Sequence, residues 1–535
     1  MQRIASVVDV NSQVFRHNEL HNRRLAAELK ERQRSARFHR PERELQRLRR
    51  QNKLFVRDRI ETLLDPETPF LELSTLAANK AYDGEVPGAA QVVGIGIVAG
   101  REVIVHADDA SVKSGAWYPL SVKKIVRALD IAIENRLPVI HLCDCAGGFL
   151  PLQAEFFADR YYAGRILRNQ SILSKMGVPQ VAIAMGHCTA GGAYVPALSE
   201  YNIIVEGTGA IFLGGPPVVK AATGENVSVE ELGGANMHTS VSGTSDYLAS
   251  SEMHAIAIAR DIVARFHRPE KTLIDRAAPE PPSYDESELY GIIPKDTRVQ
   301  FDMRQIIARL VDGSRFHEFQ QRYGTSLVCG FARLHGYQIG ILANNGVLFG
   351  DSALKGAHFI QLCDKNRTPL LFLQNVTGFM VGREYERQGI TKHGAKLIMA
   401  VSSASVPKFT VICNGSHGAG TYAMAGRAFD PRFVFTWPQS EISAMGAEQA
   451  AGVLTHVKAR QLAREGGRLS DQELATIREP ILQEYRERSS AYYATSEIWD
   501  DGILDPVDTR SALAIVLSAS LNAPIAAPHY GVFRM

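Results

Sequence analysis

The same series of segments occurs twice along this chain, and this internal repeat limits the possible folds more than any other feature. Three pairs of segments match in the same order and with almost constant separation: 92–109 with 328–345, 134–149 with 365–380, and 176–197 with 404–425. Identical residues mark each pair, among them Gly94 and Gly330, Pro138 and Pro369, and Gly192 and Gly420. A repeat of this extent predicts two copies of one structural unit.

Each copy has the pattern of a helix, an apolar strand, a glycine turn and another helix. The strands are apolar along their whole length, which is typical of a sheet covered by helices on both faces. We therefore predict an α/β fold with two similar domains, at residues 59–290 and 291–535, behind a basic helical extension at residues 1–58. The segment 278–296, rich in proline and acidic residues, marks the junction.

The charge balance excludes several classes of partner. The chain has 535 residues, with 59 Lys and Arg against 57 Asp and Glu, so no global field attracts nucleic acid or a membrane. No apolar run approaches the roughly 18 to 20 residues of a membrane span. The N-terminus lacks an apolar signal core, and acidic residues interrupt its Arg-rich part, which argues against a transit peptide. We expect a cytoplasmic protein in a bacterium, or a mitochondrial matrix protein in a eukaryote.

The six cysteines are scattered through apolar stretches, and only Cys143 and Cys145 are close in sequence. Without a second pair nearby they complete no four-ligand zinc site. We expect buried, reduced thiols and no bound metal.

The N-terminal extension differs from the rest of the chain in its composition and residue pattern. Between residues 16 and 60, Arg and Lys alternate with Glu and Leu at helical spacing, with a break at Pro41. Two interpretations stay open. The extension is either an arm that attracts phosphate or docks a partner, or a solvated helix that caps the first domain.

Two glycine turns at equivalent places suggest a chemical role. Gly191-Gly192 and Ala419-Gly420 each follow an apolar strand and open a helix. Main-chain N–H groups at the start of a helix, with its dipole behind them, stabilise a negatively charged oxygen. The alternative is that these small residues only permit close packing of strand and helix.

Several common catalytic motifs are missing from the sequence. It contains no GxxxxGKS/T phosphate loop, no GxSxG nucleophile elbow and no HExxH zinc helix. His187 and His417 lie near the glycine turns and are either bases or packing residues. The pattern therefore indicates oxyanion stabilisation without an obvious protein nucleophile and without a bound nucleotide.

These segments resemble a known family. The turns MGHCTAGGAYVPALSE and GSHGAGTYAMAGRAFDPR, together with DDASVKSGAWYPLSVKK, NVTGFMVGREYERQGITKHGAKL and the terminal GVFRM, resemble the carboxyltransferase β subunits of biotin-dependent acyl-CoA carboxylases. Within that family the resemblance is greatest to the methylcrotonyl-CoA and geranyl-CoA carboxylase β subunits. It covers nearly all of the chain from about residue 50 and implies two tandem, duplicated crotonase (ClpP)-like domains.

The resemblance also implies roles for particular residues. The first corner, Gly191 and Gly192, would hold the acyl-CoA thioester oxygen, and the second, Ala419 and Gly420, the ureido oxygen of biotin. The acyl-CoA side would be lined by Lys113, Ser114, Gly115, Ala116, Gly147 and Gly148, and the biotin side by Thr377, Gly378 and Phe379. In such enzymes carboxybiotin releases CO2, its freed nitrogen removes the substrate proton, and the enolate attacks the CO2.

The expected partners follow from the same resemblance. The sequence has no Met-Lys-Met biotinylation site and no ATP-binding module, so a separate α subunit with biotin carboxylase and biotin carrier functions is expected. In the family, the first domain of one subunit faces the second domain of another in a hexamer of two stacked trimers. The four-cysteine zinc module of bacterial acetyl-CoA carboxylase β chains is absent.

Two departures from the family pattern bear on the substrate. DCAGGFLP stands where methylcrotonyl-type enzymes have DSGGANLP, which puts Phe149 in place of a polar residue. Before the second turn stands His417, where methylcrotonyl-type enzymes carry Phe and geranyl-type enzymes Gly. A side chain of this size would partly fill the acyl tunnel, so we expect a short branched or unsaturated acyl-CoA, such as 3-methylcrotonyl-CoA, and a place in leucine or isoprenoid catabolism.

Other functions remain open at this point. The chain could instead belong to a geranyl-CoA or propionyl-CoA carboxylase, or to a biotin-dependent decarboxylase that uses the same residues in the opposite direction. A CoA hydratase or isomerase would need an acidic residue at the turns, and TAGGAY and HGAGTY carry none. A non-catalytic scaffold for carboxylase subunits is the remaining alternative.

Overall fold

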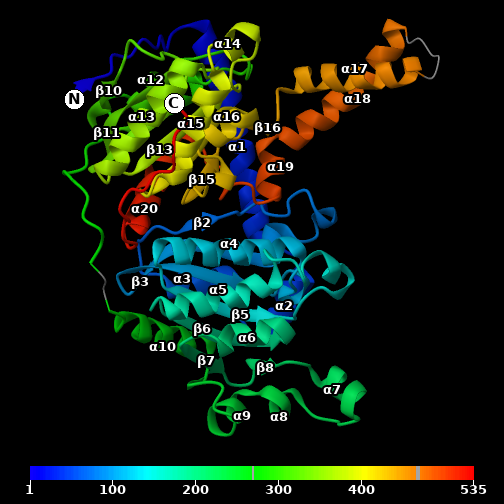
Figure 1. The fold of residues 1–535 in the computed structure, drawn as a ribbon. Helices are drawn as coiled ribbons and strands as arrows, with labels where there is room; N and C mark the ends of the chain where they lie inside the picture. Colours follow the sequence, from blue (N-terminus) through cyan, green and yellow to red (C-terminus); the bar gives the residue numbers. More distant parts are fainter. Residues whose placement is uncertain (268–269, 465–469) are drawn as a thin grey trace.

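The computed structural model describes residues 1–267, 270–464 and 470–535. In this part of the chain the strands form two sheets of eight strands, one in each half of the molecule (Figure 1). The first sheet contains β2 (Leu71–Leu73), β3 (Gln91–Val98), β4 (Arg101–Asp108), β5 (Val139–Cys145), β6 (Gln180–Thr189), β7 (Tyr201–Val205), β8 (Ala210–Phe212) and β9 (Tyr247–Ala249). The second contains β1 (Gln2–Arg3), β10 (Arg315–Phe319), β11 (Leu327–Leu334), β12 (Tyr337–Asn344), β13 (Leu370–Val376), β14 (Lys408–His417), β15 (Phe433–Thr436) and β16 (Glu441–Ser443).

The two sheets share the same arrangement of seven strands and differ in one edge strand, which is β9 beside β7 in the first and β1 beside β10 in the second. In each, an antiparallel hairpin, β3–β4 or β11–β12, leads into three parallel strands, β4-β5-β6 or β12-β13-β14. A short strand, β8 or β16, then pairs with the far end of β6 or β14. The predicted duplication and the predicted α/β class are therefore confirmed.

Helices cover both faces of each sheet, as the apolar strands predict. The first sheet lies between α3 (Val56–Leu63) with α10 (Glu252–Ala264) and α4 (Pro119–Asn135) with α5 (Ala163–Lys175). The second lies between α13 (Gly350–Lys365) with α15 (Ile390–Ser403) and α12 (Met303–Leu310) with α20 (Thr509–Ser520). One continuous apolar cluster joins α4 and α5 to α12 and α20, so the two halves share a core.

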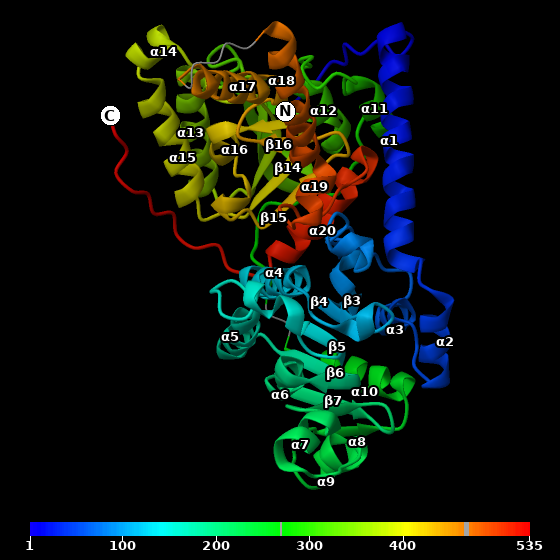
Figure 2. The same ribbon diagram turned by 90° about the vertical axis from the view of Figure 1, so that its right-hand side faces the viewer.

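The N-terminal extension contacts both halves. It forms α1 (Gln13–Phe38), α2 (Glu42–Arg50) and α3, with the predicted break at Pro41. Figure 2 shows α1 along one side of the molecule, from the second half to the first. Its N-terminal end is attached to the second half, because β1 pairs with β10 and the Asn22 side chain donates to the carbonyls of Tyr290 and Ile293 (both 2.8 Å).

A buried carboxylate also fastens the halves together. Asp501 follows α19 (Ala491–Ser496) and is fully buried. It binds Arg127 of α4 in the first half (2.8 Å) and Arg427 in the second (3.0 Å), and its carbonyl accepts the amide of Ser74 (2.8 Å). Charges removed from water need such pairing to be tolerated.

Helical excursions project from each half after the short strands β8 and β16 (Figure 1). The first consists of α7 (Pro216–Thr223), α8 (Val229–Gly233) and α9 (Ala235–Ser240), and the second of α17 (Ala447–Arg464) and α18 (Asp471–Ser489). The remaining helices are α6 (Tyr194–Ala197), α11 (Leu289–Ile292), α14 (Arg383–Arg387) and α16 (Gly418–Ala423). Within the described ranges, none of the helices combines the length and the apolar character that crossing a membrane requires.

Candidate functional site

Each half contains a corner of small residues where its third parallel strand ends. In the first half β6 runs into the short 3-10 helix η5 (Ala190–Ala193), and in the second β14 runs into α16. Ala190 and Gly418, at equivalent places, both take a left-handed backbone (φ 53° and 58°). In both corners the next residue, Gly191 or Ala419, is exposed, and the one after it, Gly192 or Gly420, is buried.

Close packing explains why glycine occupies the buried place in both corners. A Cβ atom added to Gly192 would lie 3.3 Å from the Sγ atom of Cys145. One added to Gly420 would lie 2.6 Å from Cγ2 of Val376 and 3.2 Å from Cα of Gly378. A side chain would overlap Val376 at the second corner and press tightly on Cys145 at the first, so close packing holds the main-chain amides of each corner in position.

The glycine turns beside the corners are fixed by matched hydrogen bonds. In the first half the Trp117 amide donates to the Gly147 carbonyl (2.9 Å), and the Phe149 amide donates to the Trp117 carbonyl (2.8 Å). In the second half Leu348 makes the same pair of bonds with Gly378 (3.0 Å) and Met380 (2.9 Å). The structure thus repeats the local geometry as well as the sequence.

The residues predicted for the acyl-CoA side lie together. The loop of Lys113 to Ala116 is attached to the turn after β5, because the Ala146 amide donates to the Ser114 carbonyl (3.1 Å). Gly115 has φ +68°, and a Cβ atom there would lie 2.2 Å from the Asp144 carbonyl oxygen. Only glycine fits this contact.

A cavity of about 930 Å³ opens beside this loop. Its walls come from residues 111–114, from residues 76–88 and from the end of α1 with the start of α2. Lys113 lies at its edge, where its ammonium group pairs with Glu85.

On the other half, Thr377, Gly378 and Phe379 form the turn after β13. Thr377 is exposed, whereas the Phe379 ring packs against α15, where a Cβ atom added to Gly394 would lie 3.2 Å from it. Gly378 has φ +119°, which disfavours any other residue. The three residues predicted for the biotin side are therefore contiguous with the second corner through the contact between Gly378 and Gly420.

The two residues predicted to line the acyl pocket are both engaged by neighbours. Phe149 stacks on Tyr118, with ring centroids 4.4 Å apart and an angle of 14° between the planes. His417 is 8% exposed, and its Nδ1 atom lies 2.8 Å from Oγ of Ser443. Because that hydroxyl donates to the Met445 carbonyl (2.7 Å), the hydrogen-bond pattern assigns the imidazole proton to Nδ1. Burial lowers the pKa of His417, which favours the neutral ring.

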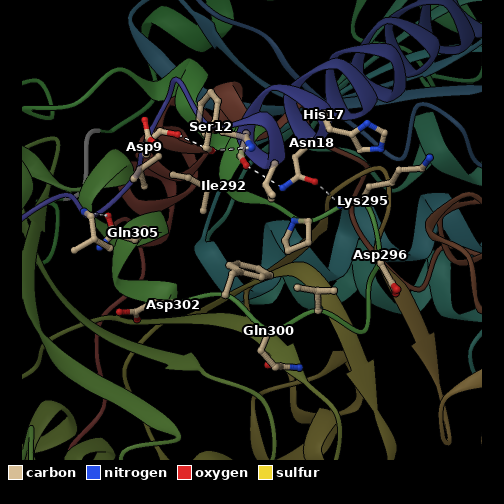
Figure 3. A pocket seen from close by; sticks show the side chains of 18 residues that line it. Asp9, Ser12, His17, Asn18, Ile292, Lys295, Asp296, Gln300, Asp302 and Gln305 are labelled. Atoms are coloured by element: carbon tan, nitrogen blue, oxygen red, sulfur yellow. Dashed lines mark hydrogen bonds between the residues drawn. The ribbon is translucent and has the colours of Figure 1, made fainter.

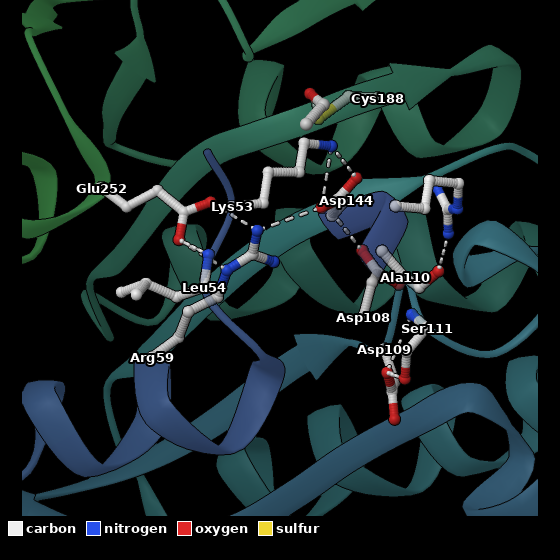
Figure 4. A network of polar contacts seen from close by, with 12 residues as sticks. Lys53, Leu54, Arg59, Asp108, Asp109, Ala110, Ser111, Asp144, Cys188 and Glu252 are labelled. Carbon is white, nitrogen blue, oxygen red and sulfur yellow. Dashed lines mark hydrogen bonds and ion pairs between the residues drawn. The ribbon is translucent and has the colours of Figure 1, made fainter. Parts of the chain in front are cut away.

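A buried ionic network below the first corner was not anticipated from the sequence (Figure 4). The Asp144 carboxylate binds Lys53 (2.9 Å) and Arg59 (3.2 Å), and Arg59 also binds Glu252. Burial alone raises the pKa of Asp144, but the two cations outweigh it and hold the pKa below its ordinary value. The one available signal was a charged residue within the apolar strand VIHLCDC.

The second half has amides where the first has carboxylates. Asp108 is fully buried and accepts hydrogen bonds from Gln91, Trp117 and the Asp144 amide; burial raises its pKa to about 6. In the repeat, Asn344 and Asn375 occupy the places of Asp108 and Asp144. Charge is therefore concentrated below the first corner and is absent from the equivalent places of the second.

A further cavity, of about 610 Å³, lies between the start of α1 and residues 291–305 (Figure 3). None of the site residues predicted from the sequence lines it. Within the described residues, no group of three or more His, Cys, Asp or Glu side chains is arranged to hold a metal ion.

Comparison with known proteins gives consistent matches over almost the whole chain. The Carboxyl transferase domain family matches residues 47–531. The chain is 51% identical over 514 residues to the biotin-dependent 3-methylcrotonyl-coenzyme A carboxylase beta1 subunit of Mycobacterium tuberculosis, covering 96% of this chain and 97% of that protein. It is 48% identical over 534 residues to the mitochondrial methylcrotonoyl-CoA carboxylase beta chain of Arabidopsis thaliana, covering 99% and 91%. The crystal structure of the P. aeruginosa geranyl-CoA carboxylase beta subunit superimposes with a TM-score of 0.89, at 39% identity and 99% coverage of both chains.

Proposed function

The chain belongs to the Carboxyl transferase domain family, and from this premise we propose that it is the carboxyltransferase subunit of a biotin-dependent acyl-CoA carboxylase. It transfers the carboxyl group of carboxybiotin to an acyl-CoA, and a short branched or unsaturated ester such as 3-methylcrotonyl-CoA is the proposed substrate. The observation that carries the proposal is the pair of matched corners, one in each half, with a buried glycine in each.

The first corner is suited to a thioester. Deprotonation beside the thioester carbonyl places negative charge on its oxygen, and the amides of Gly191 and Gly192 would stabilise that charge. The loop of Lys113 to Ala116 and the turn at Gly147-Gly148 would hold the rest of the acyl-CoA beside this corner. Their fixed contacts with β5 support this assignment.

The second corner is suited to the ureido group of biotin. Ala419 is exposed and carries only a methyl group, and Gly420 and Gly378 carry no side chain, so a flat polar group can reach the main chain. Ala419 and Gly420 would bind the ureido oxygen, with Thr377, Gly378 and Phe379 along its side. When bound, carboxybiotin supplies the carboxyl group, and its freed nitrogen accepts the substrate proton. Protein side chains therefore need to supply neither a nucleophile nor a base.

The two corners lie in separate halves of the chain, well apart in both ribbon views (Figures 1 and 2). We propose that each site is completed by the first domain of one subunit and the second domain of another, in a homo-hexamer of two stacked trimers. Biotin would be carried on a separate α subunit. The reaction would take place in the cytoplasm of a bacterium or the mitochondrial matrix of a eukaryote.

The proposal can be tested in the native host. Streptavidin should capture the biotinylated α subunit together with this chain, and the complex should fix bicarbonate on a member of a panel of acyl-CoAs. Capture of the complex without fixation on any ester would favour the scaffold alternative. Decarboxylation without fixation would favour the reverse reaction.

Residue 417 offers a test of substrate size. Replacing His417 by glycine removes a buried ring that lies over Gly415, where a Cβ atom would be 3.0 Å from its Nε2 atom. We expect kcat/KM for geranyl-CoA to rise at least about tenfold, in the range typical of a pocket that gains several methylenes of space. Ser443→Ala frees the ring without shrinking it and should bring no such gain. An unchanged kcat/KM for geranyl-CoA in His417→Gly would contradict the assignment of His417 to the acyl pocket.

A further inference from the structure

The last residue of the central strand lies below the corner in both halves. Cys145 ends β5 and Val376 ends β13, and the two are equivalent in the repeat. Each contacts the buried glycine of its own corner: Cys145 Sγ lies 3.3 Å from the position of a Gly192 Cβ atom, and Val376 Cγ2 lies 2.6 Å from that of Gly420.

A register shift at the end of each of these two strands directs the side chains of Cys145 and Val376 toward their corners. The ladder between β5 and β6 shifts register between Cys143 and Cys145, and the ladder between β13 and β14 shifts between Gln374 and Val376. Such shifts redirect the following side chain and are typical next to functional sites. Their occurrence at the same place in both halves indicates that the direction of this side chain matters.

Cys145 contacts all three segments of the acyl-CoA side. Its Sγ atom accepts a hydrogen bond from the Gly147 amide (3.2 Å) and supports Gly192. Its Cα atom lies 3.4 Å from the position of a Gly115 Cβ atom. Cys145 is therefore in contact with the loop, the turn and the corner at once, in addition to the main-chain hydrogen bonds that join the loop to the turn.

We propose that Cys145 and Val376 are positioning residues, each for its own half: Cys145 for the acyl-CoA side and Val376 for the biotin side. The proposal rests on the proposed function, since it assigns a different ligand to each corner. Neither residue needs to touch substrate; each sets the place of the amides that do.

The two residues act by different forces. Cys145 is fully enclosed, and burial raises its thiol pKa well above the ordinary value, so the thiol stays neutral and accepts the Gly147 amide in that form. Val376 is an apolar side chain that acts by packing alone. Loss of the Cys145 side chain removes a hydrogen bond as well as a contact, whereas loss of the Val376 methyl groups leaves a small void.

The test compares substitutions of the two equivalent residues, Cys145 and Val376, so that each variant is a control for the other. In the reverse reaction, a carboxylated CoA ester gives its carboxyl group to free biotin, so the KM for each ligand can be measured with this chain. Cys145→Ala should raise the KM for the CoA ester about tenfold, as loss of one hydrogen bond predicts, and leave the KM for biotin unchanged. Val376→Ala should give the opposite pattern. Cys145→Ser keeps an acceptor and should restore most of the affinity for the CoA ester.

Two further measurements separate positioning from general stability. Cys143→Ala removes the same atoms from the same buried strand, two residues before Cys145, and should leave both KM values unchanged. Binding of free CoA, measured by calorimetry, should weaken in Cys145→Ala and not in Val376→Ala. The proposal is overturned if Cys145→Ala binds CoA like the wild type, or if Cys143→Ala has the same effect. Absence of turnover in the wild type would instead refute the proposed function and leave the CoA-binding comparison intact.

Discussion

Replacing Gly420 by alanine is expected to lower the rate of carboxyl transfer by about two to three orders of magnitude, the usual effect of losing an oxyanion donor. The new methyl group would lie 2.6 Å from Val376 and 3.2 Å from the Gly378 backbone, so the start of α16 must move. Gly192→Val should have a comparable effect on the first corner. A Cβ atom at Gly192 would already lie 3.3 Å from Sγ of Cys145, so the added methyl groups of valine would crowd this contact further. Both effects are measured as kcat/KM in the complete α–β complex.

A matched substitution separates the corner from the fold. Gly164 stands in the first turn of α5, and a Cβ atom there meets nothing within 4 Å. Gly164→Ala should keep wild-type activity. If Gly420→Ala and Gly192→Val also kept it, the two corners would have no part in the chemistry.

Replacing Asp501 by asparagine is expected to destabilise the chain by about 3 to 5 kcal/mol, the usual cost of breaking a buried ion pair. The substitution leaves the guanidinium groups of Arg127 and Arg427 without their common carboxylate. Because Arg127 belongs to the first half and Arg427 to the second, the substitution weakens the contact between the two halves. We expect a lower melting temperature and the loss of a single cooperative transition in calorimetry.

The neighbouring residue, Asp500, provides a control for which the expected change in stability has the opposite sign. Asp500 is also fully buried, but burial and the Asp501 charge raise its pKa to about 6, from an ordinary value of 3.8. Between those pH values the native state holds a proton that the unfolded chain has released, so the contribution of Asp500 to stability is lost as the pH rises from about 4 to about 6. Asp500→Asn should therefore preserve or increase stability at pH 7.

Asp501 has the reverse dependence on pH. Burial acts to raise its pKa, but Arg127 and Arg427 dominate and hold the pKa well below 3.8. Its contribution is complete above the unfolded-state pKa and is lost as the pH falls through the folded-state pKa. Chemical denaturation at pH 7 and pH 5 should show a large loss in Asp501→Asn at both values. A loss of similar size in Asp500→Asn would contradict this account.

The fold was predictable because its signals are local and occur twice. Gly100 and Gly336 mark the turns of the two hairpins, and Pro138 and Pro369 each stand between a helix and a buried strand. These patterns depend on neighbours in sequence, and the repeat confirms each one independently. The sequence also predicted the helices of the extension and the break at Pro41, which fixes φ and removes an N–H donor.

The surroundings of the corners could not be predicted in the same way. Lys53, Arg59 and Glu252 meet Asp144 only because distant segments fold together, and no spacing in the sequence reveals such a contact. The role proposed for Cys145 depends on a register shift at the end of β5, which leaves no mark in the residue pattern. The sequence likewise placed the start of the extension outside the domains, whereas β1 is a strand of the second sheet.

The attachment of the N-terminal strand has a consequence for biosynthesis. The residues that receive the beginning of the chain, β10 and α11, are synthesised only after almost all of the first half. Until then the apolar stripe of α1, with Phe15, Ala26 and Leu29, has no complete surface to cover it. Domains often fold in order as they emerge, but in this polypeptide the first helix can reach its final place only after the start of the second half has been synthesised.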